Sequence, residues 1–247
     1  MKIIGIIPAR YDSKRFPGKV LADILGKPLI QRVYEQAKKA KLLNDILVAT
    51  DNEEIFKVVE NFRGKAIMTS SNCRSGTDRV AEVAKGLNAD IFVNIQGDEP
   101  LISPEVISKV AQALIEDKTI AIATVARKII AQEELNNPNV VKVVIDNGGF
   151  ALYFSRAQIP YVRDSLELES LGSVCCKHIG LYAYRRDFLL SFVQMKQTPL
   201  EKIEDLEQMR ALENGYKIKV VITEYDSVGV DTREDLEKVR KILKNSG

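Results

Sequence analysis

Cysteine and long apolar runs are scarce in this sequence of 247 residues. Its three cysteines, Cys73, Cys175 and Cys176, lack the CxxC spacing of zinc and redox sites, so we expect reduced, structural thiols. No stretch approaches the roughly 20 apolar residues of a membrane span, and the apolar opening run is broken by Pro8 and followed at once by charges. These absences predict a soluble, cytoplasmic protein without membrane contact.

An excess of charge of one sign is also lacking. The chain has 36 basic and 34 acidic residues, for a net charge of +2. It therefore has no overall field that would attract nucleic acid or an anionic membrane, and it lacks a sustained basic face with interleaved aromatic residues. We expect small-molecule partners and no nucleic acid, with any anion bound at a local site.

The first half of the chain alternates short β-branched runs with helical patterns. Strands are predicted at 2–8, 45–49, 65–68, 91–95 and 120–125, and helices at 28–40, 53–62, 78–85 and 104–115, the last behind Ser103 as N-cap. This alternation predicts right-handed parallel crossovers, with helices on both faces of a mostly parallel α/β sheet. The length is ordinary for one domain spanning 1–247.

After about residue 138 the rhythm changes. Runs at 140–145, 151–154 and 178–184 read as strands separated by turns, which predicts a smaller antiparallel lobe inserted beside the main sheet at about 138–215. One helix is expected from Thr198 to Gly215, where Thr198 and Glu201 form a capping-box pattern. A strand at 217–223 and a helix at 232–244 complete the expected elements.

A basic loop follows the first expected strand and carries Arg10, Lys14, Arg15 and Lys19. This position lies at the carboxyl edge of the sheet, where open α/β folds bind ligands. The Walker pattern GxxxxGK[ST] and the dinucleotide pattern GxGxxG are both absent, so side chains would hold phosphate. The loop predicts an anion site that could accept a triphosphate, and a solvated basic loop is the alternative.

Two carboxylates are candidates for a metal at this edge. Asp98 follows the strand at 91–95, and Asp231 precedes the last helix. Magnesium usually takes one or two carboxylates together with phosphate oxygens and waters. From the residues alone, Asp98 could equally be a turn residue and Asp231 part of a helix cap. The run Ser75 to Thr77 could be only a helix start, with Thr77 or Asp78 as the cap.

The sole histidine lies in an alternating strand. His178, Gly180, Tyr182 and Tyr184 would share a polar face, opposite a buried apolar one. This face could bind a sugar, although an isolated histidine is more often structural.

Three further polar residues could bind a sugar acid. Glu204 and Gln208 are four residues apart, so on one helix they would share a face, where they could bind hydroxyls or simply meet solvent. Arg156 could pair with a carboxylate, because guanidinium geometry suits that partner.

Seven motifs, in order along almost the whole chain, resemble those of the sugar-acid cytidylyltransferases. They are PARxxSxRFPGKxL at 8–21, SGTDR at 75–79, NIQGDEP at 94–100, YFSR at 153–156, HIGLYAY at 178–184, TPLEKIEDLEQ at 198–208 and GVDTREDL at 229–236. The resemblance implies a Rossmann-like fold of the nucleotide-diphospho-sugar transferase type. It also implies transfer of CMP from CTP to 3-deoxy-D-manno-octulosonate (KDO) for lipopolysaccharide biosynthesis. A cytidylyltransferase for another sugar acid, such as sialic acid, or a catalytically silent nucleotide-binding homologue are the alternatives.

The resemblance further implies roles for individual residues. The expected catalytic residues are Arg10, Arg15, Lys19, Asp98 and Asp231, of which Asp98 and Asp231 would hold magnesium, with two ions in the ternary complex. Nucleotide-binding roles fall on Arg10, Lys19, Arg74, Ser75, Gln96 and Gly97. Substrate-binding roles fall on Gln96, Arg156, His178, Tyr182, Glu204 and Gln208. A homodimer is also implied, for which the region 165–176 offers apolar residues.

Overall fold

The computed structural model describes residues 1–13, 15–163, 172, 174–226 and 228–245. A nine-stranded sheet forms its centre, with the path β11-β7-β10-β6-β1-β4-β5 and with β8 and β9 attached through β10. These strands are β1 (Ile3–Ala9), β4 (Asp45–Thr50), β5 (Ala66–Met68), β6 (Ile91–Asn94), β7 (Ile122–Lys128), β8 (Lys142–Ile145), β9 (Ala151–Ser155), β10 (Cys175–Arg185) and β11 (Ile218–Ile222). A separate hairpin pairs β2 (Asp23–Ile24) with β3 (Lys27–Pro28).

Helices lie between the strands along the chain. They are η1 (Lys19–Leu21), α1 (Leu29–Ala37), α2 (Glu53–Asn61), α3 (Gly76–Lys85), α4 (Pro104–Glu116), α5 (Gln132–Asn136), α7 (Arg186–Phe192), α8 (Pro199–Glu204), α9 (Met209–Glu213) and α10 (Arg233–Asn245). Ser103 is the N-cap of α4, as expected. For α3 the expectation was wrong: the N-cap is Ser75 rather than Thr77 or Asp78, and Ser75 Oγ accepts from the Asp78 amide at 3.1 Å.

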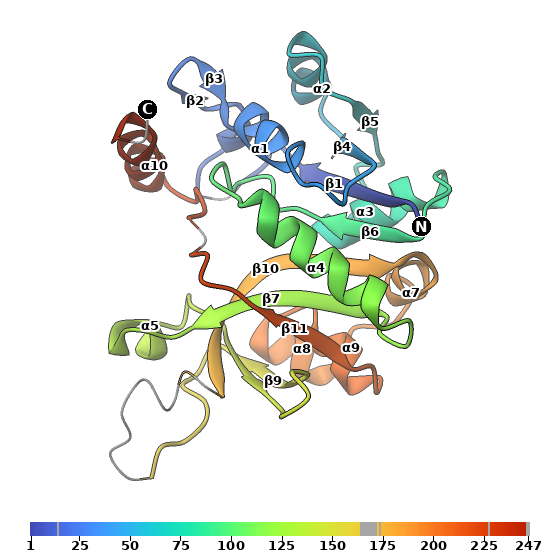
Figure 1. Cartoon of the computed structure of the whole chain (residues 1–247). Coiled ribbons are helices and arrows are strands. Elements are labelled where there is room, and N and C mark those ends of the chain that lie inside the picture. Colours follow the sequence, from blue (N-terminus) through green and yellow to red (C-terminus); the bar gives the residue numbers. More distant parts are fainter. Residues whose placement is uncertain (14, 164–171, 173, 227, 246–247) are drawn as a thin grey trace.

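Both faces of the sheet are covered by helices (Figure 1). Strand β1 shows why, because its alternate isoleucines enter two different cores. Ile3 and Ile7 belong to the cluster that includes apolar residues of α1 and α4. Ile4 and Ile6 belong to the cluster that includes residues of α3, α7 and α9. The expected Rossmann-like α/β fold is thereby confirmed.

The sheet is mostly parallel, with one strand reversed in its middle. Strands β4, β1 and β6 run parallel, and β11 runs parallel to β7. Strand β10 is antiparallel to both β6 and β7 and lies between them (Figure 1). The expectation that residues 178–184 lie in a lobe beside the main sheet was therefore wrong. Among the described strands of the large sheet, β8 and β9 alone lie off its path, and they too are hydrogen-bonded to it through β10.

The single helix expected from Thr198 to Gly215 is also wrong. Helix α8 ends at Glu204 because Asp205 adopts a left-handed conformation with φ of 53°. The amide of Leu206 then donates to the Glu201 carbonyl, and α9 starts only at Met209. The other expected strands and helices are confirmed with small shifts of their ends.

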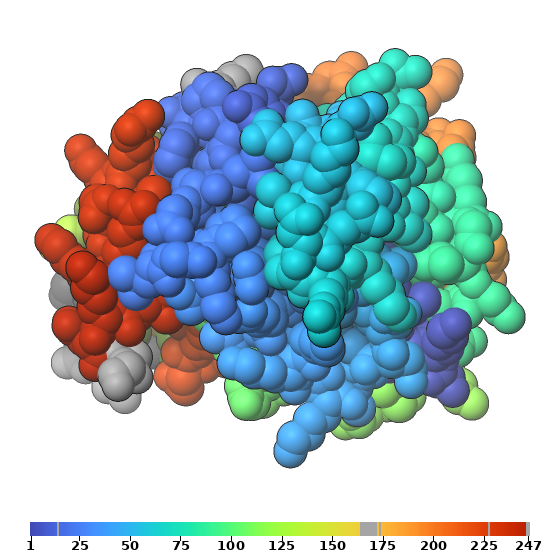
Figure 2. Space-filling view, turned by 90° about the horizontal axis from the view of Figure 1, so that it is seen from above, coloured from blue at the N-terminus to red at the C-terminus, as the bar shows by residue number. Residues whose placement is uncertain are grey.

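The C-terminal helix α10 lies beside the hairpin of β2 and β3, whereas the N-terminus lies at the other side of the molecule (Figure 1). Figure 2 shows the C-terminal helix α10 in red against N-terminal segments in blue. Arg240 of α10 donates through Nε to the Asp23 carbonyl at 3.1 Å. Within the described residues, no helix is both long and apolar enough to cross a membrane.

Candidate active site

A cavity of about 800 Å³ opens where β1 and β6 end, and we call it the main cavity. Its walls come from the basic loop, the turn after β6 and the start of α3, together with Asp205 and Asp231 from later in the chain. The lining residues are Pro8, Ala9, Arg10, Asp12, Ser13, Arg15, Pro17, Lys19, Val20, Cys73, Ser75, Gly76, Arg79, Gln96, Gly97, Asp98, Asp205 and Asp231. The predicted position at the carboxyl edge of the sheet is confirmed for Arg10, Arg15 and Lys19 of the basic loop, whereas Lys14 lies outside the described residues.

The basic loop is closed by its own backbone. The amide of Gly18 donates to the Tyr11 carbonyl at 2.8 Å, and Gly18 has φ of 69°, which favours glycine. Lys19 follows at once as the first residue of η1. This turn directs the Lys19 side chain into the main cavity.

Lys19 joins the two predicted metal ligands. Its Nζ lies 2.6 Å from Asp98 Oδ2 and 2.9 Å from Asp231 Oδ1. The Lys19 side chain is only 12% exposed, against 30% for Asp98 and 47% for Asp231. Burial, the largest single influence, lowers the pKa of Lys19, but the charges and hydrogen bonds of both aspartates outweigh it and raise that pKa above its ordinary value. The ammonium group is therefore held in its charged form.

The backbone brings the two aspartates together. The amide of Val230 donates to the Asp98 carbonyl at 2.9 Å, which fixes the segment before α10 against the turn after β6. The cap of α10 is made by Thr232 and Asp235, whose side chains each accept from the other's amide. The carboxylate of Asp231 instead contacts Lys19 and, at 2.7 Å, Arg15 Nη2.

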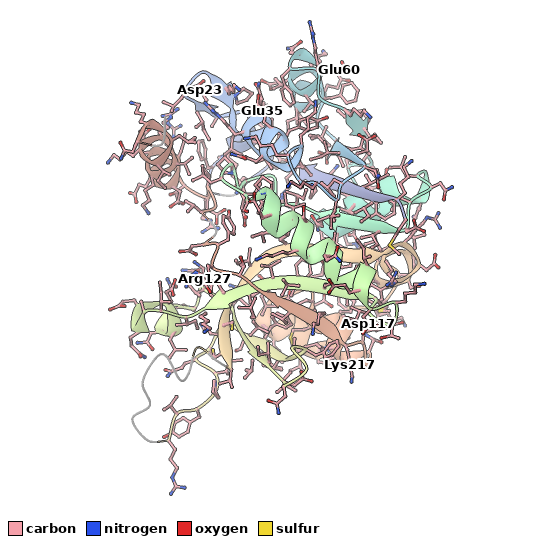
Figure 3. The ribbon with its side chains drawn as sticks, in the orientation of Figure 1. Asp23, Glu35, Glu60, Asp117, Arg127 and Lys217 are labelled. Carbon is pink, nitrogen blue, oxygen red and sulfur yellow. The ribbon has the colours of Figure 1, made fainter. Side chains whose placement is uncertain are left out.

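A second charged cluster holds the segment that leads to Asp231. Arg127, labelled in Figure 3 on β7, donates through Nε to Asp226 Oδ1 at 2.8 Å and pairs with Glu134 of α5. Lys177 of β10 contacts the same Asp226 oxygen at 2.7 Å. Asp226 is thereby fixed to the sheet a few residues before Asp231.

The residues expected to bind nucleotide are divided between two cavities. Arg10, Ser75, Gln96 and Gly97 line the main cavity with Lys19. Arg74 lines a neighbouring cavity of about 820 Å³, and Ser75 and Asp205 line both. The two cavities therefore adjoin at these residues.

The turn after β6 lies tightly against β1. A Cβ atom on Gly97 would be 2.7 Å from the Pro8 carbonyl oxygen, so a larger residue would force the turn away from β1. Gln96 points toward β10, where its Nε2 donates to the Gly180 carbonyl at 2.7 Å. Gln96 thus connects the main cavity with the reversed strand.

Sequence reasoning missed Arg79 as a wall residue. Its guanidinium is buried and pairs with Asp51 Oδ2 at 2.8 Å through Nη2, while Nη1 donates to Thr69. The signal was present, because Arg79 stands four residues after Ser75 and so shares its face of α3.

Tyr182 is buried and His178 is only partly exposed, so the two residues do not form an open polar strip. The expected alternation is confirmed, since Ile179, Leu181 and Ala183 enter one core. On the other face, Tyr182 and Tyr184 are buried, with ring centroids 5.7 Å apart, while His178 and Gly180 are partly exposed. Neither His178 nor Tyr182 lines either cavity.

The histidine is held as a neutral ring. Its Nε2 lies 3.0 Å from Thr124 Oγ1, and its ring meets the edge of Phe154 with centroids 5.0 Å apart. Burial lowers the pKa of His178 to about 3. At neutral pH this residue can offer a hydrogen bond but not a positive charge.

Glu204 and Arg156 form a contact between α8 and β9. Glu204 accepts from Ser155 Oγ at 2.7 Å and from the Arg156 amide at 2.9 Å. The Arg156 guanidinium donates to the carbonyls of Glu204, Asp205 and Pro138, so it satisfies the end of α8.

The break at Asp205 separates Glu204 from Gln208, so the expected shared helix face is wrong. Gln208 is buried, and its Nε2 has no hydrogen-bond partner among the described residues. A buried donor without a partner is costly unless a ligand or water satisfies it.

Glu207 is a second residue that the sequence did not single out. It is partly buried, accepts from Thr77 Oγ1 of α3, and has a pKa raised by desolvation. It joins the turn between α8 and α9 to the start of α3, which carries Ser75. No spacing rule in the sequence marks this contact.

The chain matches the family model described as cytidylyltransferase over residues 4–218. A relative from Geotalea uraniireducens is 54% identical over 99% of this chain and 100% of its own, and one from Geotalea daltonii is 53% identical over the full length of both. Both are named 3-deoxy-manno-octulosonate cytidylyltransferase.

Two solved structures are also similar to this chain. A CMP:2-keto-3-deoxy-manno-octonic acid synthetase complexed with CTP is 41% identical, has a TM-score of 0.94 and is covered completely, as is this chain. A putative glucose-1-phosphate thymidylyltransferase from Bacillus anthracis, 14% identical with a TM-score of 0.69, shares the fold and covers 98% of this chain and 96% of its own.

The fold and the matches define the class of protein: the chain belongs to the cytidylyltransferase family. Within that family, the two full-length relatives from Geotalea uraniireducens and Geotalea daltonii, each more than half identical to this chain, are named 3-deoxy-manno-octulosonate cytidylyltransferase. The resemblance noted from the seven motifs is confirmed.

Proposed function

We propose that this chain transfers CMP from CTP to KDO and releases pyrophosphate. One observation carries the proposal: the basic loop and the two carboxylates meet in the main cavity of a chain that shares its whole fold with a synthetase complexed with CTP. The full-length relatives named for this activity support KDO as the acceptor.

The two carboxylates fit a magnesium ion. The Lys19 ammonium contacts one oxygen of each, so a single cation already reaches both. Two carboxylates with phosphate oxygens and waters are the usual magnesium ligands. When bound, magnesium would neutralise phosphate charge and lower the pKa of the attacking hydroxyl. We propose two such ions in the ternary complex, one of them held by Asp98 and Asp231.

The chain's own residues would act mainly by position and charge. The anomeric 2-hydroxyl of KDO would attack the α-phosphorus in line, with pyrophosphate as the leaving group. Arg10, Arg15 and Lys19 would stabilise the charge that develops on the phosphates. Ser75, Gln96 and Gly97 would hold the nucleoside. Arg74, in the neighbouring cavity, would act at the junction of the two cavities.

The acceptor would contact the side of the site nearest β10. Gln208 has an unsatisfied buried donor that a sugar hydroxyl could meet. His178 and Tyr182 lie on either side of Gly180 in β10, and the carbonyl of Gly180 accepts a hydrogen bond from Gln96. For Arg156 and Glu204, which already bind each other's backbone, a role in sugar binding requires at least part of these contacts to be exchanged.

We also propose a homodimer, acting in the cytoplasm in lipopolysaccharide biosynthesis. Most of the expected interface at 165–176 lies outside the described residues, and within it Val174 is exposed. Ile130 and Tyr161, exposed by 74% and 89%, flank the small cluster of Ile129, Leu135 and Cys175. These exposed apolar side chains support an interface there.

A pyrophosphate-release assay tests the proposal. KDO and sialic acid are each offered with CTP, UTP, ATP or GTP, with and without magnesium. Release only with KDO, CTP and magnesium is the expected result. Release with sialic acid instead would assign another acceptor, and CTP binding without any release would favour a silent nucleotide-binding homologue.

A further inference from the structure

In this structure, two basic side chains of the protein contact the two aspartates that are proposed to bind the metal. Lys19 Nζ contacts both Asp98 and Asp231, and Arg15 Nη2 contacts the second oxygen of Asp231. Two positive side chains thus balance two carboxylates. The basic loop is consequently paired with the acidic residues through Lys19 and Arg15, of which Lys19 is largely buried and Arg15 is 63% exposed.

An ammonium and a divalent cation cannot share these oxygens. Lys19 is largely buried, so little water would screen the repulsion between its charge and a metal ion at the same place. The ion can bind both carboxylates only if the ammonium leaves. A lysine side chain has four flexible carbons and can reach another partner, provided that an anion is close by.

A triphosphate supplies that anion. Lys19 and Arg15 line the main cavity together with Arg10, where the phosphates of CTP are proposed to lie. On CTP binding, the loop cations would gain phosphate oxygens and release the carboxylates to the metal. Charge is balanced before and after this exchange, so neither the buried lysine nor the aspartates are left unpaired.

We propose that Lys19 occupies the metal position in the free protein and exchanges partners when CTP binds, so that nucleotide and divalent cation bind with positive coupling. This inference rests on the proposed function. By linkage, CTP raises the affinity for the metal by the same factor by which the metal raises the affinity for CTP. In the free protein, Lys19 acts as an internal competitor of the metal.

The test measures Mn²⁺ binding to the free protein, from the electron paramagnetic resonance signal of unbound Mn²⁺ without nucleotide. Lys19→Met should bind Mn²⁺ at least about tenfold more tightly than the wild type, because the competing charge is gone. Lys19→Arg keeps the charge and should stay near the wild type. Adding Asp98→Asn to Lys19→Met should remove the gain, which locates the ion.

Lys65→Met is the matched control. Lys65 pairs with Asp45 at the same 2.6 Å, but Asp45 begins β4, at the opposite edge of the sheet. The control loses the same charge and should leave Mn²⁺ affinity unchanged. Circular dichroism checks folding, and Lys19→Gln replaces Lys19→Met if the methionine variant does not fold.

The outcomes separate this inference from the proposed function. Equal Mn²⁺ affinity in Lys19→Met, Lys65→Met and the wild type would overturn the exchange, even if the wild type releases pyrophosphate from CTP and KDO. A gain that survives Asp98→Asn would overturn it as well, because the ion would then lie elsewhere. Absence of pyrophosphate release would overturn the proposed function but not the competition measured in the free protein.

Discussion

Two lysines in different regions of this molecule have different hydrogen-bond partners. Lys19, in the main cavity, contacts two carboxylates and keeps 12% of its side chain exposed. Lys142, on β8 at the far end of β10, is fully buried, and its Nζ donates to the carbonyls of Asn137, Val140 and Arg156 at 3.0, 2.7 and 2.6 Å. Their pKa values shift in opposite directions.

The different partners of the two lysines indicate different roles: the charge of Lys19 is available for ligand binding, whereas the charge of Lys142 stabilises the fold. Carboxylates attract other cations, so the partners of Lys19 can be shared with a metal. Backbone carbonyls belong to the chain itself, and Lys142 ties the turn at 137–140 to the residue after β9. Variants at the first site should therefore alter the reaction, whereas variants at the second should alter stability.

The largest effect is expected for Asp98→Asn. Turnover should fall by about 10² to 10³, because charge stabilisation in the transition state is lost, while CTP affinity changes much less. Steady-state kinetics and equilibrium dialysis with CTP measure the two quantities. Asp45→Asn, which breaks the matched pair with Lys65 at the opposite edge, is the control. Near-normal turnover of Asp98→Asn with magnesium would refute the metal assignment.

Lys142→Met should have the next largest effect, this time on stability. Removal of the ammonium leaves buried carbonyls without their donor, so the free energy of unfolding should fall by about 3 kcal/mol. Urea unfolding with an unchanged slope would show this, and turnover of the folded variant should stay normal. Lys57→Met on the exposed face of α2 should change stability by less than about 0.5 kcal/mol. If Lys142→Met and Lys57→Met had equal free energies of unfolding, Lys142 would have no special role in stability, and the proposed difference between Lys142 and Lys19 would be refuted.

Lys19→Ala should reduce kcat/KM by about 10-fold to 100-fold, as expected for loss of one phosphate contact in the transition state. Lys19→Arg should recover part of this loss, since it restores the charge. Thermal unfolding of the alanine variant should stay close to that of the wild type. A large loss of stability instead would make Lys19 a structural residue like Lys142.

The smallest expected effect is the pH dependence of the contribution that Lys142 makes to stability. Burial lowers the pKa of Lys142 below its ordinary value of 10.5. Between the lowered pKa and 10.5 the unfolded chain binds more protons at this residue than the folded one, so its contribution to stability rises with pH. The difference in unfolding free energy between the wild type and Lys142→Met should therefore widen from neutral pH toward pH 10. A constant or narrowing difference would contradict the lowered pKa.

The parts of the site that follow a strand directly could be predicted from the sequence. Lys19 and Asp98 come after β1 and β6, and the edge rule of parallel sheets brings them into one cavity. The position of β10 could not be predicted, because an alternating strand does not reveal its neighbours. The break at Asp205 was missed as well, since the capping pattern at Thr198 marks the start of a helix but not its end. Glu207 and Thr77 meet only through tertiary packing.

Strand β10 lies in the middle of the sheet and also carries the extension formed by β8 and β9. Its first residues pair with β8, and the stretch from Tyr182 to Arg185 pairs with β6. Because one continuous strand pairs with both parts, β8 and β9 form a direct extension of the sheet rather than a separate unit. The register with β7 shifts between Ile179 and Tyr182, so the strand is locally irregular there, as at a β-bulge. Gln96 Nε2 donates to the Gly180 carbonyl within this stretch, so a change in the path of β10 at Gly180 would displace a side chain that lines the main cavity.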